Sequence, residues 1–191
     1  SSLYDIVVSP LLLRFPQEII CVSRSVRDFL QKTLKVKKIP CIIWSGIDIN
    51  FWKPINRHTE KKGAFNVVFV GRVVFEKVIF VLIVSIRYAP KNVSYFIVGD
   101  GPDMLNLRNY IHSKALDGRI LCTGLLSREQ TKALFFEMDI FANPSFYAEG
   151  LQLSLLEAAS FGLPIISTNL PGIAEFFPKG SYVRIEKRNP Q

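Results

Sequence analysis

The sequence places two cations around a turn that follows an apolar run. Arg72 comes directly after the run 67–70 and Gly71, and Lys77 stands where the next helix is expected to begin. A glycine lets the backbone approach a ligand closely, and an arginine with a lysine at a helix start can clamp a diphosphate through charge-assisted hydrogen bonds. Two cations beside a turn are more often simply solvated, so this pair alone does not establish a site.

Two glutamates in the segment 144–158, separated by seven residues, form the second chemical pattern. If a helix begins just after Gly150, its first free N–H groups, in 151–154, point toward one edge and can hold phosphate oxygens. Glu149 then stands at the mouth of such a site, next to a sugar. Glu157 lies two turns along the helix and can reach a ribose, because a carboxylate accepts hydrogen bonds from vicinal hydroxyls.

A plainer interpretation is that Glu149 complements the helix dipole and that Glu157 is an exposed helix residue. Glu157 lies between the apolar pairs 155–156 and 158–159. An unpaired carboxylate is costly if such neighbours bury it, and this cost favours a binding role for Glu157.

Short apolar runs alternate with segments of helical length, and these elements must position the four side chains. The expected strands cover 67–70, 95–98, 120–123, 140–142, 164–167 and 182–185, and the expected helices cover 76–89, 102–116, 128–137 and 151–161. This alternation predicts a doubly wound α/β fold, a Rossmann-like parallel sheet with helices on both faces. Ligands of such sheets bind beyond the carboxyl ends of the strands, so four loops should share one edge. They begin at Gly71, Gly99, Gly124 and Pro144.

One segment carries conflicting signals. The run 78–86 is rich in β-branched residues, which favour a strand. It lies between two expected parallel strands, whose connection needs a crossover of a dozen or more residues, and a buried helix can be apolar on most sides. We therefore expect a helix there.

The first 45 residues follow a different pattern. A strand is expected at 18–22, a helix at 26–34 with Ser23 as its cap, a second strand at 41–44, a loop as far as Pro54, and an exposed connector at 55–64.

Composition and charge predict a folded domain and argue against nucleic-acid binding. With 191 residues, 49% hydrophobic and 21% charged, the chain is expected to fold as one α/β domain with an appendage. The net charge of +8 is concentrated outside the motif-bearing part: residues 1–64 hold eleven cations and five anions, whereas 65–177 hold nine and ten. The lysine clusters lack interleaved aromatic residues, so we expect no nucleic-acid binding.

Cysteine and histidine content predicts neither a metal site nor a disulfide. The three cysteines are far apart, only two histidines are present, and this usage fits a reducing cytoplasm.

The apolar run 78–86 is far shorter than the roughly 20 residues that cross a bilayer. The first residues do not have the pattern of a signal peptide, so the chain is expected to begin within a longer protein.

The motifs, taken in order, resemble the donor-binding domain of family 4 retaining glycosyltransferases, which have the GT-B fold. The resemblance covers about residues 18–177. It rests on Phe69-Val70-Gly71-Arg72 with Glu76-Lys77, Ile97-Val98-Gly99-Asp100-Gly101-Pro102, Thr123-Gly124, Asp139 with Pro144-Ser145, the pair Glu149 and Glu157, Gly162-Leu163-Pro164, and Pro171-Gly172 with Glu175. Upstream, Ile19 to Ser23 and Ser45-Gly46-Ile47-Asp48 resemble the end of the other domain and the linker.

The resemblance implies a retaining transfer of a sugar from a nucleotide diphosphate sugar to an acceptor held by the other domain. Arg72 and Lys77 would neutralise the diphosphate and stabilise the leaving group without a metal or cofactor. Glu149 would hold sugar hydroxyls, and Glu157 the ribose. Phosphate contacts would come from the backbone of Gly150, Leu151, Gln152 and Leu153, and Gly71 would let the backbone approach the donor closely. The base pocket would be bordered by residues 99–102, with Gly99 and Gly101, and by the loop after Gly124.

Three positions depart from the family pattern. Val78 and Gln152 stand where glycine is usual, and Ser45 where asparagine is usual. The first two could crowd the phosphates, so the alternative function is a non-catalytic binding or assembly module with a decayed site. A sugar-nucleotide epimerase is a further alternative that fits the paired glutamates less well. Neither His58 nor His112 matches the family's histidine, which belongs to the other domain.

The resemblance also implies a domain organisation and partners. Residues 1–45 would be a remnant of the N-terminal acceptor domain with the hinge, and 46–191 the donor domain, truncated at its end. The acceptor would be a glycan, a lipid or a small molecule. The expected location is the cytoplasm, with peripheral contact at the inner membrane surface suited to the basic N-terminal third. A fragment of this kind is expected to be inactive alone.

Overall fold

The computed structural model describes residues 13, 15–54, 63–74, 79–146, 150 and 152–185. Its contacts divide the chain into two units. The smaller comprises residues 1–46, 148–153 and 170–179, and the larger comprises 47–147, 154–169 and 180–191. The proposed division into residues 1–45 and 46–191 stays a prediction. Each unit is described by itself.

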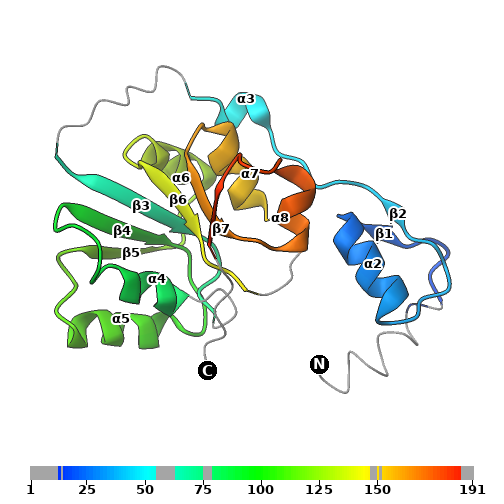
Figure 1. Ribbon diagram of the computed structural model, residues 1–191, viewed down its shortest axis with the longest axis horizontal. Coiled ribbons are helices and arrows are strands. Elements are labelled where there is room, and N and C mark those ends of the chain that lie inside the picture. The colour runs from blue at the N-terminus through cyan, green and yellow to red at the C-terminus, as the bar shows by residue number, and fades with distance from the viewer. Residues whose placement is uncertain are drawn as a thin grey trace. The chain divides into compact units, whose positions relative to one another are not determined.

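The larger unit contains a parallel sheet of six strands in the order β5-β4-β3-β6-β7-β8 (Figure 1). The strands are β3 (Phe65–Val70), β4 (Val93–Val98), β5 (Ile120–Gly124), β6 (Ile140–Asn143), β7 (Ile165–Thr168) and β8 (Val183–Ile185). The chain starts in the centre, moves outward to β5, and returns to build the other half from β6 to β8. All six expected strands are confirmed, and so is the doubly wound topology.

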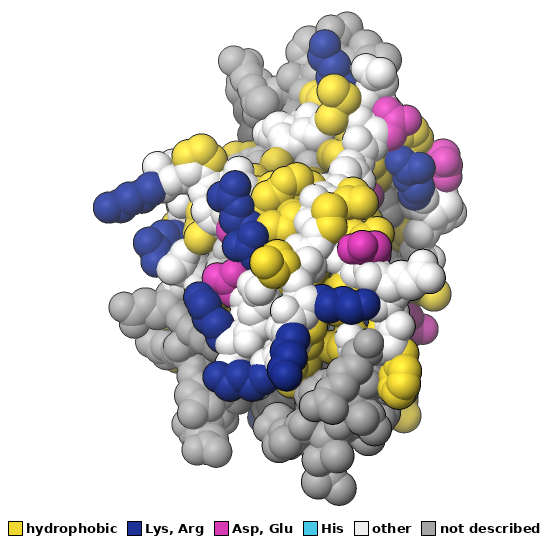
Figure 2. All heavy atoms as spheres, turned by 90° about the vertical axis from the view of Figure 1, so that its right-hand side faces the viewer, with side chains coloured by type: hydrophobic (Ala, Val, Ile, Leu, Met, Phe, Trp, Pro, Cys, Tyr) yellow, Lys and Arg dark blue, Asp and Glu magenta, His cyan; other side chains and the backbone are white. Residues whose placement is uncertain are grey.

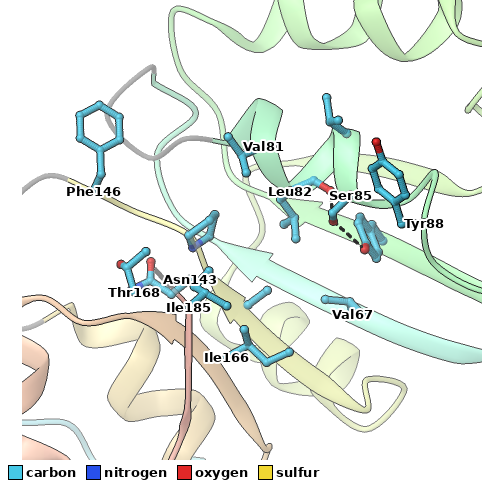
Figure 3. A pocket seen from close by; sticks show the side chains of 14 residues that line it. Val67, Val81, Leu82, Ser85, Tyr88, Asn143, Phe146, Ile166, Thr168 and Ile185 are labelled. Atoms are coloured by element: carbon cyan, nitrogen blue, oxygen red, sulfur yellow. Dashed lines mark hydrogen bonds between the residues drawn. The ribbon is translucent and has the colours of Figure 1, made fainter. Parts of the chain in front are cut away.

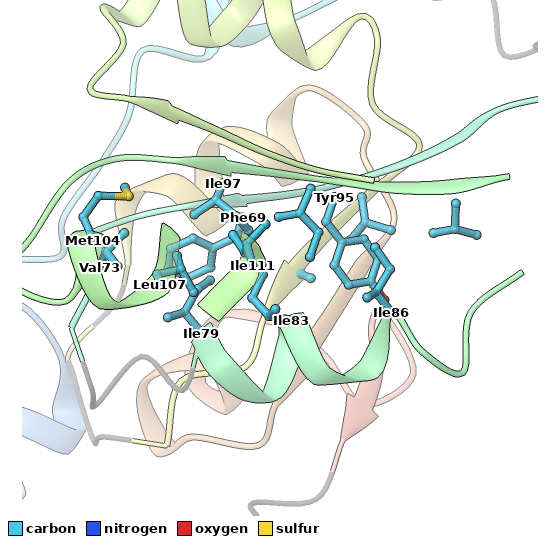
Figure 4. Packing of buried hydrophobic residues seen from close by; sticks show 14 residues of the cluster. Phe69, Val73, Ile79, Ile83, Ile86, Tyr95, Ile97, Met104, Leu107 and Ile111 are labelled. Atoms are coloured by element: carbon cyan, nitrogen blue, oxygen red, sulfur yellow. The ribbon is translucent and has the colours of Figure 1, made fainter. Parts of the chain in front are cut away.

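Helices cover both faces of this sheet, as Figure 1 shows: α4 (Ile79–Ser85) and α5 (Met104–Ser113) lie on one face, α6 (Arg128–Phe135) and α7 (Leu153–Ser160) on the other. The helix predicted for the run 78–86 is confirmed by α4. Ile79 and Ile83 of α4 are fully buried. They pack with Phe69 of β3 and Leu107 of α5 in the main core cluster (Figure 4). Burial against the sheet therefore overrides the strand propensity of the β-branched residues.

The opposite face is packed by aromatic rings. Phe135 of α6 lies 5.5 Å from Phe161, 6.4 Å from Phe141 of β6 and 5.6 Å from Trp52, measured between ring centroids. Trp52 ends a short helix, α3 (Ile49–Trp52), where the sequence predicted a loop. The Asp48 carboxylate accepts from the backbone N–H groups of Asn50 and Phe51, and this cap starts the helix.

The smaller unit joins segments that are distant in sequence. The parallel strands β1 (Ile20–Cys21) and β2 (Cys41–Ile42) accompany the helices α2 (Arg24–Lys32) and α8 (Pro171–Phe176). Ser23 caps α2 as expected, with its hydroxyl accepting from the N–H of Val26. The Glu175 carboxylate of α8 accepts from the N–H groups of Arg24 and Ser25, which places a negative charge at the start of α2.

Candidate functional site

A pocket of about 630 Å³ opens at the carboxyl edge of the larger unit's sheet. It is formed by the loops after β3, β4 and β5, the arrangement expected for a doubly wound sheet. Its lining consists of Val70, Gly71, Arg72, Val98, Gly99, Asp100, Gly101, Pro102, Leu125, Leu126 and Thr131. We call it the edge pocket. It brings together four of the residues predicted for the site: Gly71, Arg72, Gly99 and Gly101.

Arg72 provides the positive charge of the edge pocket. Its side chain is exposed, and among the described residues no carboxylate forms an ion pair with it. The Asp100 carboxylate, in the same pocket, accepts from the backbone N–H of Gly101 at 2.7 Å. No carboxylate of the described residues thus competes for the guanidinium, which can bind an oxyanion through two parallel hydrogen bonds.

Gly124 lies next to the pocket rather than in its lining. It has a φ of 75°, and its carbonyl oxygen accepts from the N–H of Gly99 at 2.8 Å. Asp100, Pro102, Leu125 and Leu126 of the lining belong to the two segments that the resemblance assigned to the border of the base pocket, 99–102 and the loop after Gly124. Thr131 of α6 also lines the pocket and was not predicted. The position of Thr131 in the first turn of the helix after β5 is the signal that could have identified it.

The start of α7 is tied to the end of β3. The Ser154 hydroxyl donates to the carbonyl oxygen of Val70 at 3.0 Å. Glu157, one turn further along α7, is half-buried and does not line the edge pocket. Desolvation by burial raises the pKa of Glu157, and the charge of Arg128 partly opposes the rise. Glu157 is therefore a carboxylate whose charge is disfavoured in the absence of a partner.

Arg128 is itself surrounded by aromatic rings. Its guanidinium carbon lies 4.6 Å from the ring centroid of Phe51 and 6.0 Å from that of Trp52. Lys132 approaches Phe51 as well, at 4.9 Å. These cation–π contacts fix the start of α6 against α3.

The ends of β6 and β7 carry a buried polar cluster that the sequence did not predict as a unit. Its members Asn143, Ser145, Ser167 and Thr168 are at most 2% exposed. The Asn143 amide nitrogen donates to the Ser167 hydroxyl at 3.1 Å, and the Thr168 hydroxyl donates to the carbonyl oxygen of Ser145. The cluster fixes the chain just before the segment that contains Glu149.

The other predicted site residues fall either outside the described residues or in another part of the described chain. Lys77, Glu149 and Leu151 lie outside the described residues. Gly150, Gln152 and Leu153 are grouped with the smaller unit. There, a Cβ on Gly150 would lie 3.0 Å from the Val22 side chain and 3.8 Å from the Ser23 hydroxyl, so Gly150 lies close to the start of α2.

A second pocket, of about 590 Å³, lies on the α4 face of the same sheet (Figure 3). Val81, Leu82 and Ser85 of α4 face Val67, Ile166 and Ile185 of the strands. The Ser85 and Tyr95 hydroxyls hydrogen-bond to each other at 2.9 Å. Among the described residues, no charged side chain lines this pocket, so those residues offer no cation to a phosphate.

The described parts of the chain contain neither a cluster of metal ligands nor a membrane-spanning helix. There, no three histidine, cysteine, aspartate or glutamate side chains group as metal ligands. Within the same residues, none of the helices combines the length and the apolar character needed to cross a bilayer.

Comparison with known proteins adds a family. The family model described as "Glycosyl transferases group 1" matches residues 50–190. The gpi3 subunit of phosphatidylinositol N-acetylglucosaminyltransferase from Schizosaccharomyces pombe is 29% identical over 90% of this chain and 39% of its own length. The putative teichuronic acid biosynthesis glycosyltransferase TuaC of Bacillus subtilis is 33% identical over 65% of this chain and 30% of its own. The chain thus spans well under half of these curated relatives.

Solved structures share the fold. HepE of Anabaena, in complex with UDP and glucose, has a TM-score of 0.79 and 22% identity over 92% of this chain and 51% of its own. Sucrose-phosphate synthase from Thermosynechococcus elongatus has a TM-score of 0.82 and 18% identity over 95% and 48%. At these identities the likeness concerns the fold alone, and it confirms the predicted half of a GT-B architecture.

Proposed function

Because the chain belongs to the family of group 1 glycosyl transferases, we propose that it supplies the donor site of a glycosyltransferase that uses a nucleotide diphosphate sugar. The observation that carries this proposal is the edge pocket with the exposed guanidinium of Arg72. Its position beyond the carboxyl ends of β3, β4 and β5 is where doubly wound sheets bind nucleotides. The full-length protein would transfer the sugar with retention of configuration to an acceptor bound outside this chain.

The proposed chemistry is electrostatic. Arg72 neutralises the diphosphate of the donor and stabilises the charge that develops on the nucleoside diphosphate as the glycosidic bond breaks. Lys77 is the predicted second cation, and together the two replace a metal ion. Glu149 is the predicted partner of the sugar hydroxyls. Glu157 is the predicted partner of the ribose, and its desolvated carboxylate supports that role, because two hydroxyl donors would stabilise the charge that burial disfavours.

The relatives suggest which donor to test first. Those from Schizosaccharomyces pombe and Niallia circulans are among the relatives named as N-acetylglucosaminyltransferases or their subunits. The HepE structures contain UDP or UDP-glucose. UDP-N-acetylglucosamine is therefore the first probe, followed by UDP-glucose and by GDP and ADP sugars.

Calorimetric titration of the chain with this panel tests the proposal. We expect one class of nucleotide to bind and Arg72→Ala to weaken it by about tenfold to a hundredfold, the loss of one charge-assisted bidentate contact. Arg87→Ala, at an exposed arginine outside the edge pocket, is the matched control and should leave affinity unchanged. If no nucleotide of the panel binds, the donor-site assignment is wrong.

The alternative of a decayed site rests on Val78 and Gln152, which stand where the family has glycine. Replacing both by glycine separates the two functions. An active donor site should gain little affinity, whereas a large gain in nucleotide binding would identify the present chain as a decayed module.

A lipid-linked acceptor at a membrane surface is part of the proposal. The described cations of the smaller unit are Arg24, Arg27, Lys32, Lys35, Lys37, Lys38 and Lys179, and its described anions are Glu18, Asp28 and Glu175. On the face drawn in Figure 2, Lys and Arg side chains lie among hydrophobic ones, and Asp and Glu side chains are also present. Basic segments bind anionic lipids. Co-sedimentation with phosphatidylserine vesicles, compared with phosphatidylcholine vesicles, tests this contact, and equal binding to both would contradict it.

A further inference from the structure

The loops after β3 and β4 continue to pair after their strands end. The ladder of β3 with β4 runs from Phe65 opposite Val93 to Val70 opposite Val98. Beyond it, the N–H of Gly71 donates to the carbonyl oxygen of Val98 at 2.9 Å, and the N–H of Val73 donates to that of Asp100 at 2.9 Å. The N–H of Asp103 donates to the carbonyl oxygen of Val73 at 3.2 Å. We call segments 71–74 and 99–103 the paired loops.

Two glycines make this close approach possible. A Cβ on Gly99 would lie well within 3.0 Å of the Gly71 carbonyl oxygen, and a Cβ on Gly101 would lie well within 3.0 Å of that of Val73. Both contacts are to backbone, which cannot rotate away as a side chain can. Gly99 also has a φ of 126°, a conformation that residues with a side chain rarely adopt. These two positions therefore require glycine because of the neighbouring loop.

Arg72 lies between the two hydrogen-bonded residues of the first loop. Gly71 precedes it and Val73 follows it. Val73 is also fully buried in the main core cluster. The backbone of the exposed arginine is thus fixed on both sides, although its side chain has no ion-pair partner among the described residues.

We infer that Gly99 and Gly101 are positioning residues for Arg72: by allowing the paired loops to lie backbone against backbone, they hold the guanidinium ready at the edge pocket. This inference rests on the proposed donor site. It assigns the two glycines a role different from bordering the ligand, since the added atoms would meet protein backbone. A cationic side chain on a backbone that is already fixed loses less conformational entropy when it binds a diphosphate.

Four glycines separate the causes of any effect. Gly99 combines a positive φ with the backbone clash, Gly101 has the clash without a positive φ, and Gly124 has a positive φ with open space around its Cβ position. Gly118 has neither, so Gly118→Ala is the matched control. If Gly99→Ala does not fold, Gly101→Ala carries the test.

Amide hydrogen exchange tests the paired loops without any nucleotide. In the unmodified chain, the amides of Gly71 and Val73 should be protected as strongly as those of β3, although they lie beyond the strand. Gly101→Ala should accelerate their exchange by about tenfold, the loss of one net hydrogen bond, and Gly118→Ala should not. Unprotected amides in the unmodified chain would overturn the inference whether or not any variant folds.

A double-mutant cycle tests the link to Arg72. With UDP as the probe, Gly101→Ala should weaken binding by about tenfold in the presence of Arg72 and have almost no effect in Arg72→Ala. The same fold loss in both backgrounds would mean a general structural role and would overturn the inference. If UDP, GDP and ADP do not bind the unmodified chain, the donor-site assignment fails, and hydrogen exchange alone decides whether the paired loops fix the backbone of Arg72.

Discussion

The sheet of the larger unit ends in two different ways at its carboxyl edge. After β3 and β4 the chain is held by main-chain hydrogen bonds, such as that from Val73 to Asp100. After β6 and β7 it is held by buried side chains, as in the Asn143 to Ser167 bond of 3.1 Å. The main-chain arrangement has no room for a Cβ at Gly99 and Gly101. The side-chain arrangement depends instead on the polar atoms of its buried residues.

This difference predicts opposite sensitivities to substitution. At β3 and β4, adding one carbon atom should do the damage. At β6 and β7, removing one hydroxyl or amide should do it, because a buried polar partner is then left unsatisfied.

The largest effect is expected from Gly99→Ala. It introduces both a backbone clash and a side chain at φ 126°, and the free energy of unfolding should fall by about 3 kcal/mol or more. Thermal and urea denaturation measure the change, with Gly118→Ala expected within about 0.5 kcal/mol of the unmodified chain. Similar losses in both variants would show that the paired loops contribute nothing specific.

Thr168→Val should have the next largest effect. It removes the hydroxyl that donates to the carbonyl oxygen of Ser145, in a site that is 2% exposed at Thr168. The loss of this buried hydrogen bond should cost about 1–3 kcal/mol of stability in urea denaturation. Thr168→Ser, which keeps the hydroxyl, is the control and should lose less than the valine variant. The reverse order would mean that methyl packing matters more than the hydrogen bond.

A smaller effect is expected for the coupling between Asn143 and Ser167. Both are buried, and each loses the same hydrogen bond when the other is replaced. Asn143→Leu, Ser167→Ala and the double variant should give a coupling free energy of about 0.5–1.5 kcal/mol. Additive losses in the double-mutant cycle would place the stabilisation elsewhere in the cluster.

The smallest effect concerns the charge on Glu157. Because burial raises the pKa of Glu157, the folded state holds its proton more tightly than the unfolded state. The contribution of Glu157 to the free energy of unfolding should therefore be largest below the ordinary pKa of a glutamate and be lost as pH rises through the raised value. Glu157→Gln removes this loss and should raise the melting temperature at pH 7 by about 1–3 °C, with no difference at low pH.

A lower melting temperature for Glu157→Gln at pH 7 would mean that the carboxylate has a stabilising partner in the free protein. If Glu157 binds the ribose, the same variant should weaken UDP binding while stabilising the fold. The two measurements then move in opposite directions.

Much of the fold was predictable because its signals are local. Short apolar runs in the sequence indicate the strands. The helix α4 was predicted correctly because its place between two parallel strands outweighed the strand propensity of its β-branched residues. The glycines of the paired loops were visible as a motif. Their contacts were not visible in the sequence, because the carbonyl oxygens of Gly71 and Val73 belong to the loop after β3, whereas Gly99 and Gly101 belong to the loop after β4.

The predictions that failed or were missing depend on contacts between distant segments. The short helix α3 replaces a predicted loop because its Trp52 is buried against Phe135. The polar cluster of β6 and β7 escaped notice because serine, threonine and asparagine in a strand carry no periodic signal. Lys77 and Glu149 stay predictions, as they lie outside the described residues.

The bond from Glu175 to the start of α2 has a practical consequence for anyone dividing this protein. Its two ends are 151 and 150 residues apart in the chain, yet they belong to one compact unit. Cutting after residue 46 would strip α8 of the helix it caps and leave the Phe176 ring without its 4.8 Å contact to Trp44. Expression boundaries drawn from linear order would thus split a folded unit. A workable fragment must contain residues 1–46 together with 170–179.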